Sequence, residues 1–504
     1  MSELLTPPVL IALSIALPFL AFLGCLLLPR QDNLRDWLTL VLAVALFATV
    51  VTIFTQFQAG TSFAVEVISF SPSLSIGFEI ERLGLVFALV ASSLWILTHL
   101  YGVGYMRGNK EKKHARFFGA FAFAISATMG LAFSSNLLTL FLFYEALTVS
   151  TYPLVAHKET AEAKSGARVY LGILMGTSIA LLLTAIVSTY VVAGRLDFVP
   201  GGLLSDPSVG PVNSTTLVVL LALFAFGIGK AALMPFHRWL PAAMVAPTPV
   251  SALLHAVAVV KAGVFTMLKV GVYIFGIDRL AETGASQWLM WVAAVSILTA
   301  SLIAMQQDNL KKRLAYSTVS QLSYITLGMA LANSLGVLGG GLHIVTHAFG
   351  KITLFMCAGA IYVATHKTEI SQMRGLGRQM PFTFIAFGIG ALSIIGLPPL
   401  TGSWSKWTLL LASADAGQLV IMGVLMLSSL LNVAYLLPIF ARGFYGDGIK
   451  PAQSTWRERL AEAPVLCVLP PCITALGCLI LFFVSDDIVA FLQPIATTVT
   501  AGAQ

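Results

Sequence analysis

The sequence predicts an all-α integral membrane protein with about 14 transmembrane helices, inverted repeats, and breaks in helices 7 and 12. Three observations predict this fold: an apolar composition, an uneven distribution of basic residues among the loops, and two matched interruptions by Gly and Pro. Of 504 residues, 58% are hydrophobic and only 10% are charged, whereas soluble domains carry about 25% charged residues. The net charge of +7 is therefore not interpreted as a nucleic-acid-binding surface.

Apolar stretches of about 20 residues, enough to cross the hydrocarbon core, begin near residues 8, 37, 83, 117, 136, 170, 216, 251, 287, 314, 336, 382, 418 and 464. We expect the first to be a spanning helix and not a signal peptide, because Met1, Ser2 and Glu3 provide no basic segment. The prediction is one transmembrane domain, 1–504, made of four parts. These are helices 1–3 (1–115), a five-helix repeat (116–276), a second five-helix repeat (287–445) and helix 14 (464–490).

Basic residues gather on one side of this predicted topology. Loops after odd-numbered helices hold 21 of the 29 Lys and Arg residues, and loops after even-numbered helices hold three. Cytoplasmic loops of membrane proteins are enriched in Lys and Arg. We therefore expect a bacterial-type cytoplasmic (inner) membrane protein with both termini on the non-cytoplasmic side.

Six charged residues lie inside the predicted spans: Glu145, Lys230, Lys261, Lys269, Lys351 and Lys406. Each would oppose insertion by about 2.5–3.5 kcal/mol if it faced lipid, or ~15 kcal/mol together. They should therefore face the interior of the bundle. Structural ion pairs are one explanation, and Lys269 could equally snorkel from a helix end. One glutamate cannot pair with five lysines, however, and a desolvated lysine can release and regain a proton near neutral pH. A proton relay is the favoured interpretation.

Three histidines add intermediate positions for a proton. His343, His347 and Lys351 are spaced at i, i+4 and i+8 on one helix face, and His255 precedes Lys261 by six residues. Histidine titrates near neutrality, which suits a link in a relay. Packing histidines or a metal site are the alternatives. The two stacked histidines have no nearby carboxylate or Cys ligand, which disfavours a metal.

The pentapeptide AFGIG occurs twice, at 225–229 and at 386–390, in predicted helices 7 and 12. Prolines follow within about a turn or two, Pro235 in one case and Pro398 and Pro399 in the other. Breaks at Gly229, Pro235, Pro398 and Pro399 would free backbone groups in the middle of the membrane. Paired breaks in oppositely oriented repeats are a sequence indicator of a transport site. A chance recurrence of five small and apolar residues is the alternative.

The sequence contains no CxxC, P-loop, HExxH or GxGxxG-plus-acid pattern, and its five cysteines lie in apolar runs without metal spacing. We therefore expect no cofactor and no metal. No catalytic or redox site is expected in this chain, so it could be part of an enzyme only as a subunit of a proton-translocating oxidoreductase.

The segment PFHRWLPAAMVAPTPVSALLH at 235–255, followed by VKAGV at 260–264, resembles the signature of the proton-conducting subunits of respiratory complex I and of Mrp-type cation/proton antiporters. The resemblance covers helices 4 to 12. It implies that Glu145 partners Lys230, that Lys261 is the central relay lysine, and that His347 and Lys351 in HAFGK form a relay pair. Lys406, after LPPLTG at 397–402, would be the gate on helix 12.

Two departures separate the branches of this family. The helix-12 gate is a lysine where one complex I branch has glutamate, and no long lateral helix follows helix 14. Both favour the D-type subunit of Mrp antiporters. The expected function is proton translocation as a subunit of a multi-subunit Mrp-type monovalent cation/proton antiporter, in contact with other membrane subunits. Na⁺, if transported, would be handled by a neighbouring subunit.

Other hosts stay open at this point. The chain could be the proton-pumping membrane subunit of a complex I-like NADH-quinone oxidoreductase or of a membrane hydrogenase. It could also couple energy to inorganic carbon uptake, or be a structural scaffold, although six buried charges disfavour a scaffold. The driving reaction, cation specificity, direction and stoichiometry do not follow from the sequence.

Overall fold

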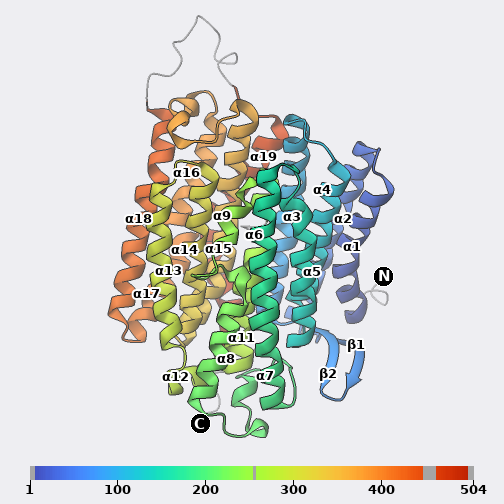
Figure 1. Ribbon diagram of the computed structural model, residues 1–504, viewed down its shortest axis with the longest axis vertical. Helices are drawn as coiled ribbons and strands as arrows, with labels where there is room; N and C mark the ends of the chain where they lie inside the picture. The colour runs from blue at the N-terminus through green and yellow to red at the C-terminus, as the bar shows by residue number, and fades with distance from the viewer. Residues whose placement is uncertain (1–5, 254–256, 446–460, 498–504) are drawn as a thin grey trace, which may run out of the picture.

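A computed structural model describes residues 6–253, 257–445 and 461–497. It confirms an all-α membrane fold, in which long, roughly parallel helices form an elongated bundle (Figure 1). The N-terminal half contains α1 (Pro7–Leu27), α2 (Asp32–Gln58), α3 (Arg82–Gly108), α4 (His114–Ala132), α5 (Leu137–Val155), α6 (Ala161–Thr177), α7 (Leu183–Ala193), α8 (Ser214–Gly227), α9 (Trp239–Ala242), α10 (Thr248–Ala252), α11 (Val259–Val270) and α12 (Ile277–Thr283). The C-terminal half contains α13 (Gln287–Gln306), α14 (Leu310–Ala330), α15 (Ser334–Thr365), α16 (Pro381–Ile395), α17 (Gly402–Asp415), α18 (Leu419–Phe444), α19 (Val465–Phe483) and α20 (Ser485–Thr497).

Each of the fourteen predicted stretches begins inside one of these helices or within one residue of its start. In the described residues, ten helices are long and apolar enough to cross a membrane unaided, or up to eleven if one bent pair counts as a span. The other stretches fail this test for identifiable reasons. α8 and α16 stop after 14 and 15 residues because their spans are broken, and α14 opens with Lys311, Lys312 and Arg313.

The seventh and twelfth predicted spans are broken where the sequence predicts. In the structure, the seventh corresponds to α8 and α9 and the twelfth to α16 and α17. α8 ends at Gly227 and is followed by a 3₁₀ turn, Gly229–Ala231, and by Ala232 in the left-handed region at φ 54°. α16 ends at Ile395 and is followed by Gly396 at φ 93°, and α17 begins only at Gly402. The chain rises from α8 to α9 but descends from α16 to α17, so the two broken helices run in opposite directions (Figure 1).

The two AFGIG copies are not equivalent in the structure. The first straddles the end of α8 and places Gly229 in the break itself. The second lies wholly inside α16, and Gly390 packs there against the backbone of Gly350 and the side chain of Thr353. Only the prolines mark the second break. The repeated pentapeptide is therefore a poorer guide to a break than the proline that follows it.

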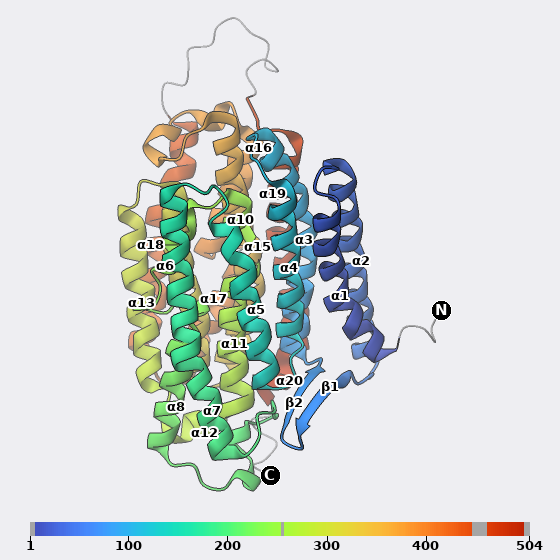
Figure 2. The same ribbon diagram turned by 45° about the vertical axis from the view of Figure 1, so that its right-hand side comes forward.

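A two-stranded hairpin, β1 (Ala64–Ser71) with β2 (Leu74–Glu79), joins α2 to α3 and was not predicted. It lies at the lower end of the bundle beside α5 (Figure 2). The Thr139 hydroxyl at the start of α5 accepts a hydrogen bond from Gly77 N at 3.1 Å. The β-branched and aromatic residues of the hairpin suit a strand, but the segment is too short and too polar to stand out as an apolar span.

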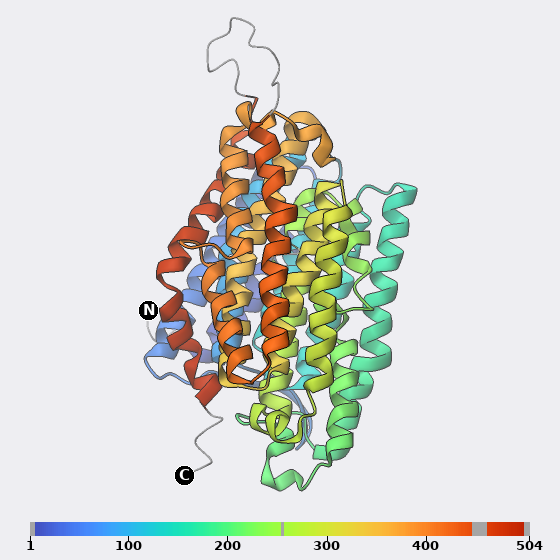
Figure 3. The same ribbon diagram turned by 90° about the vertical axis from the view of Figure 1, so that its left-hand side faces the viewer.

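The core of the bundle is centred on α15, whose apolar window is 94% buried, whereas those of α1 and α2 are 33% and 28% buried. α15 packs against α14, α16, α17, α19 and α3. The α1–α2 pair lies at one edge of the molecule (Figure 2). In the rotated view, the dark red helices α19 and α20 lie on the left and the yellow-green α13 lies to the right of the centre (Figure 3). Charged groups on α15 are therefore the farthest from lipid.

Candidate functional site

Lys230 lies in the break of helix 7, in the 3₁₀ turn between α8 and α9, and is fully buried. Its Nζ donates to the Tyr144 carbonyl oxygen at 2.8 Å and to Thr148 Oγ1 at 2.5 Å, both on α5. Trp239 Nε1 donates to the Gly229 carbonyl at 2.9 Å and closes the break from the other side. A side chain at Gly263 of α11 would overlap the backbone of Lys230 and Ala231. The glycine of the VKAG motif thus lets the broken segment pack directly on α11.

Glu145 is the neighbour of Tyr144 on α5, and it is close enough to Lys230 to interact with it electrostatically. No ion pair between the two is formed among the described residues. Both Glu145 carboxylate oxygens are buried without a hydrogen-bond partner in the described part of the chain. An ionised carboxylate in this state is costly. The site therefore has the components of an ion pair, with the lysine held instead by neutral oxygens of α5.

Lys261 and His347 form the most direct link in the interior. Lys261 Nζ on α11 lies 2.7 Å from His347 Nδ1 on α15, and both side chains are at most 1% exposed. One proton must lie between these two nitrogens, on either the amine or the imidazole. A separation in the range of about 2.6–3.2 Å is the geometry required for proton transfer. The predicted central lysine and the predicted helix-11 histidine therefore meet.

His343 continues this line one turn away on α15. The two imidazole rings have centroids 5.8 Å apart. His343 Nδ1 lies 2.9 Å from Ser405 Oγ on α17, and its ring stacks on Tyr324 of α14 at 5.5 Å. Sequence spacing placed the two histidines on one face, and the structure shows that this face points toward the second broken helix.

Lys351 and Lys406 are held by neutral oxygens, as Lys230 is. Lys351 Nζ donates to Ser317 Oγ on α14 at 2.6 Å, and Tyr435 of α18 donates to the same oxygen at 2.9 Å. Lys406 Nζ donates to the Ile395 carbonyl at 3.1 Å, at the open end of α16. The ammonium of Lys406 lies 5.2 Å from the centre of the Tyr324 ring. The break in helix 12 thus supplies the carbonyl that binds its lysine.

These groups sense one another's charge. Lys351 interacts electrostatically with both Lys406 and Lys261, and His347 interacts with all three lysines and with His343. Like charges in a medium of low dielectric repel strongly. Protonation of one member therefore opposes protonation of the next.

In the part of the chain that the structure describes, buried polar atoms without a hydrogen-bond partner lie on the helices that carry or contact the relay lysines and histidines. Among the described residues they include His343 Nε2, His347 Nε2, both polar atoms of the Gln321 amide, Thr326 Oγ1 and Asn432 Nδ2. They belong to α14, α15 and α18, the helices that carry or contact the relay groups. Buried polar atoms without protein partners are places where proteins bind internal water. The interior around the relay lysines and histidines thus has polar atoms to which internal water can bind, between one relay side chain and the next.

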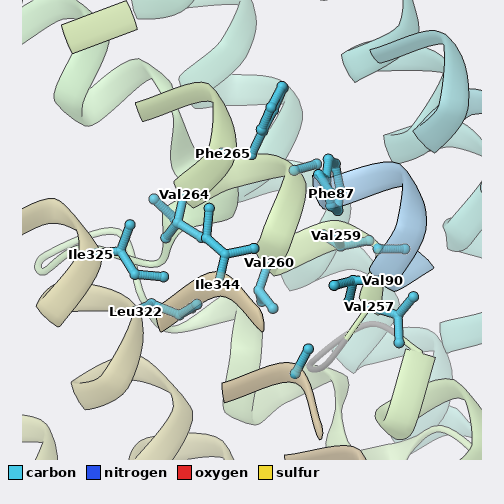
Figure 4. Close-up of a cluster of buried hydrophobic side chains, with 14 of the residues drawn as sticks. Phe87, Val90, Val257, Val259, Val260, Val264, Phe265, Leu322, Ile325 and Ile344 are labelled. Atoms are coloured by element: carbon cyan, nitrogen blue, oxygen red, sulfur yellow. The ribbon is translucent and has the colours of Figure 1, made fainter. Parts of the chain in front are cut away.

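Lys269 lies apart from this line, two turns below Lys261 on α11. It is fully buried and not snorkelling. Its Nζ is 3.5 Å from Glu81 Oε1 and donates to the Ser134 carbonyl at 2.9 Å. Apolar side chains of α11, α3, α14 and α15 surround the helix between and beside the two lysines, including Val264, Phe265, Phe87, Ile325 and Ile344 (Figure 4). Among the described residues no side-chain hydrogen bond links Lys261 to Lys269, since Thr266 between them donates to the Ala262 carbonyl of its own helix.

Sequence reasoning missed a second buried ion cluster. Arg35 precedes the predicted start of the second span near residue 37. In the structure it lies inside α2 and is fully buried. It donates to Asp36 Oδ1 at 2.8 Å, and Arg107 at the end of α3 donates to Asp36 Oδ2 at 2.7 Å. Asp36 is therefore a more enclosed carboxylate than Glu145. The cluster ties α2 to α3 and α4 near one face of the bundle, away from the lysines of the interior.

The sequence-predicted positions are thus largely brought together. His255 lies outside the described residues, so its place in the line stays a prediction. The hydroxyls around the relay were not predicted: Thr148 and Ser317 accept from Lys230 and Lys351, Ser405 bonds to His343, and Tyr435 donates to Ser317. Ser, Thr and Tyr are frequent in membrane helices, and only the adjacency of Tyr144 to Glu145 could have drawn attention to this part of α5. Within the described ranges, no group of three or more His, Cys, Asp or Glu residues is placed to hold a metal ion.

Comparison with known proteins gives consistent results. A family model described as NADH:quinone oxidoreductase/Mrp antiporter, TM, matches residues 134–432. A second model, the NADH-ubiquinone oxidoreductase (complex I) chain 5 N-terminus, matches residues 68–118. The chain is 30% identical to NADH-quinone oxidoreductase subunit N of Desulforudis audaxviator, over 81% of this chain and 83% of that protein. It is 32% identical to NAD(P)H-quinone oxidoreductase chain 5 of Picosynechococcus sp., over 66% of this chain but only 50% of that protein.

Two solved structures share the fold. A chain of the Mrp complex from Dietzia sp. superposes with a TM-score of 0.84 at 21% identity, covering 98% of both chains. A chain of the membrane-bound sulfane sulfur reductase, an archaeal respiratory membrane complex, gives a TM-score of 0.83 at 22% identity and 97% coverage of both. The family match spans more than half of this sequence, and a relative at 30% identity is covered over most of its length. The chain therefore belongs to the family of NADH:quinone oxidoreductase/Mrp antiporter transmembrane subunits.

Proposed function

We propose that this chain translocates protons along the line Lys230, Lys261, His347, His343 and Lys406, with Lys351 as a further member and Glu145 setting the charge at its start. The observation that carries this proposal is the 2.7 Å contact between Lys261 and His347. This contact joins α11, which follows the first broken helix, to α15, which precedes the second. Each end of the line reaches a broken helix, where free backbone groups are available.

The proposed step is a shift of charge followed by a shift of proton. When Glu145 is ionised and near Lys230, it stabilises the ammonium form. When that attraction weakens, desolvation and the repulsion of the other cations favour release of the proton toward Lys261. His347 and His343 then pass it toward α17, because imidazole accepts on one nitrogen and donates from the other.

For the host, we place the chain in a multi-subunit Mrp-type monovalent cation/proton antiporter, with other membrane subunits as its partners. The full-length superposition on a chain of an Mrp complex supports this assignment. Na⁺ would bind on a neighbouring subunit. We further propose that 116–276 and 287–445 are inverted five-helix repeats, an arrangement favoured by the opposite directions of the two broken helices. The face rich in Lys and Arg would be cytoplasmic, with both termini on the other side.

A second candidate is the pump arm of a redox complex. It is favoured by the curated relatives, which are named as quinone oxidoreductase subunits, and by the match to a chain of an archaeal respiratory complex. This chain would then move protons while other subunits perform the electron transfer.

One experiment separates the two hosts. The tagged native protein would be purified in mild detergent and its bound partners identified by mass spectrometry. Small membrane subunits without redox cofactors, together with a pH change driven by Na⁺ in vesicles, would establish the antiporter. Co-purifying iron–sulfur or nickel proteins would establish the redox host. Absence of proton movement in vesicles containing either complex would contradict the proposed function itself.

A further inference from the structure

A pocket of about 150 Å³ opens on the face that carries most of the Lys and Arg residues. It lies where five segments meet: the end of α3, the chain after α5, the junction of helices 7 and 8, the start of α14 and the chain after α15. A cavity of about 10–15 Å³ already holds one water molecule, so this pocket has room for several waters or for a small polyatomic ion. None of its lining residues belongs to the relay described above.

Three lysines line this pocket, and no aspartate or glutamate does. Lys158, Lys311 and Lys367 come from three different segments of the chain. Among the described residues, none of the three forms an ion pair. Lys311 Nζ donates to the Ala246 carbonyl at 2.6 Å, and the Lys158 ammonium lies 5.7 Å from the centre of the Tyr362 ring. Three lysines thus line one cavity whose described lining residues include no acidic side chain, and burial together with the charge of Lys158 lowers the pKa of Lys311 to about 7.

Neutral donors complete the lining. Tyr105, Thr248, Asn309 and Thr368 contribute hydroxyl or amide groups. The Glu369 carboxylate lies next to this lining and accepts hydrogen bonds from Asn309 Nδ2 at 3.0 Å and Thr368 Oγ1 at 3.1 Å, so these two donors are already engaged. α14, a helix of 21 residues, begins at the pocket and adds the positive end of its dipole. Ammonium groups, hydroxyls and a helix start are the groups that bind phosphate oxygens in proteins.

A second basic pocket on the same face provides an internal contrast. It is lined by Arg116, Lys164, Arg168 and also by Glu159. Glu159 lies 2.6 Å from Lys113 and 2.5 Å from Arg116, so its carboxylate already neutralises that cluster. The Lys158–Lys311–Lys367 pocket has no such internal anion. A general enrichment of this face in basic residues explains the pocket that contains Glu159. It does not explain why three lysines without an ion-pair partner among the described residues line one cavity.

We propose that the Lys158–Lys311–Lys367 pocket binds a phosphate-type oxyanion. The pocket sits beside α15, the most buried helix of the bundle, which favours a free anion from the aqueous phase; a phospholipid headgroup carries the same chemistry. Because Lys311 also holds the Ala246 carbonyl after the break in helix 7, the bound anion would fix α14 to the segment that leads into α10 and α11. This inference does not depend on the proton pathway or on the identity of the host complex.

The test measures binding of radiolabelled inorganic phosphate to the native complex in nanodiscs of uncharged lipid, by equilibrium dialysis. The test variant carries Lys158→Gln, Lys311→Gln and Lys367→Gln. The matched control carries Lys112→Gln, Lys164→Gln and Lys312→Gln, which removes the same charge from the same face outside the pocket. A single Lys367→Glu variant, which changes only one side chain in a connecting segment, guards against loss of folding in the triple variant. Retained phospholipid is measured in parallel by mass spectrometry of the complexes as purified.

Saturable phosphate binding that weakens at least tenfold in the triple variant and in Lys367→Glu, but not in the control, supports a free anion. Absence of phosphate binding, with an anionic phospholipid retained by the native protein and control but lost from both pocket variants, supports a lipid headgroup as the source. Equal phosphate binding and equal lipid retention in all four proteins would overturn the proposal, as would the absence of both ligands from the native protein.

Discussion

The two broken helices hold their lysines in different ways. In the first, Lys230 Nζ donates to two neutral oxygens of α5 and lies 3.2 Å from the centre of the Tyr144 ring, and the neighbouring Glu145 interacts with Lys230 electrostatically. In the second, Lys406 contacts the carbonyl released by the break itself, and Lys351 contacts Ser317. No carboxylate forms an ion pair with either among the described residues.

This difference assigns different tasks to the two halves. The first half has an opposite charge that can approach or leave its lysine, so it can change the protonation of Lys230 by a small movement. The second half has only dipoles, which stabilise an ammonium less than a full charge does. It can respond to charge arriving from Lys261 but has no carboxylate of its own to drive a change.

The largest effect is expected when either half loses its lysine. Lys230→Ala and Lys406→Ala should each reduce proton flux in vesicles at least about tenfold, since a lost relay step costs at least ~1.4 kcal/mol. Lys312→Ala, on an exposed surface, is the matched control. Flux close to the native value in Lys406→Ala, with assembly intact, would show that the second broken helix is not part of the pathway.

A smaller effect is expected from Glu145→Gln. The substitution keeps the shape of the side chain but removes the charge that distinguishes the first half. Flux should fall about three- to tenfold, less than for Lys230→Ala, because the lysine itself remains and only an electrostatic interaction worth roughly 0.7–1.4 kcal/mol is removed. Stopped-flow recording of a pH dye inside liposomes measures the change. An increase in flux would reverse the role assigned to the carboxylate.

The second half can be tested through a hydroxyl. Ser317→Ala removes the hydrogen bond to Lys351 Nζ and should lower flux about two- to fivefold, as expected for one buried hydrogen bond of roughly 0.5–1 kcal/mol. Ser323→Ala is the control, because its hydroxyl bonds only to the Val319 carbonyl of its own helix. Equal flux in both variants would exclude Ser317 from the pathway.

The smallest effect is expected at the surface. Hydrogen bonds from Lys113 and Arg116 lower the pKa of the exposed Glu159 carboxyl from 4.5 to about 2. A lowered folded-state pKa stabilises the protein above about 4.5, and this contribution is lost as pH falls toward 2. Glu159→Gln should therefore lower the melting temperature at pH 6 by only about 1–2 °C, because exposed ion pairs are weak. The difference from the native protein should shrink at pH 3, and a constant difference would contradict this account.

Much of this fold follows from composition and pattern. Apolar stretches locate every span, because a membrane leaves few alternatives to a hydrogen-bonded helix. Pro235 and Pro398 locate the breaks, because proline cannot continue a helix. The hairpin between α2 and α3 and the burial of Arg35 escaped prediction, since neither depends on an apolar run. The charge of Arg35 is offset by Asp36, and only three-dimensional proximity reveals such a pair.

The site was predictable in its charges but not in its contacts. A lysine inside an apolar run is conspicuous in the sequence, because charged residues are rare in membrane spans. Lys230, Lys261, Lys351 and Lys406 were therefore predicted from the sequence. Their hydroxyl partners Thr148 and Ser317 were not found, because hydroxyls in membrane helices usually bond to their own backbone, as Thr266 does to Ala262. The separation of Lys269 from Lys261 also needed the structure, because both occupy one helix and differ only in what surrounds them.

The most direct test of the central claim replaces each of two lysines of α11 by arginine. Arginine keeps the positive charge but does not release its proton in proteins. Lys269→Arg can still pair with Glu81 and should leave proton flux within about twofold of native, a small change on the scale set by 1.4 kcal/mol per tenfold. Lys261→Arg should abolish proton flux while the complex stays assembled. Native flux in the Lys261→Arg variant would show that this lysine does not exchange a proton, and would contradict the account.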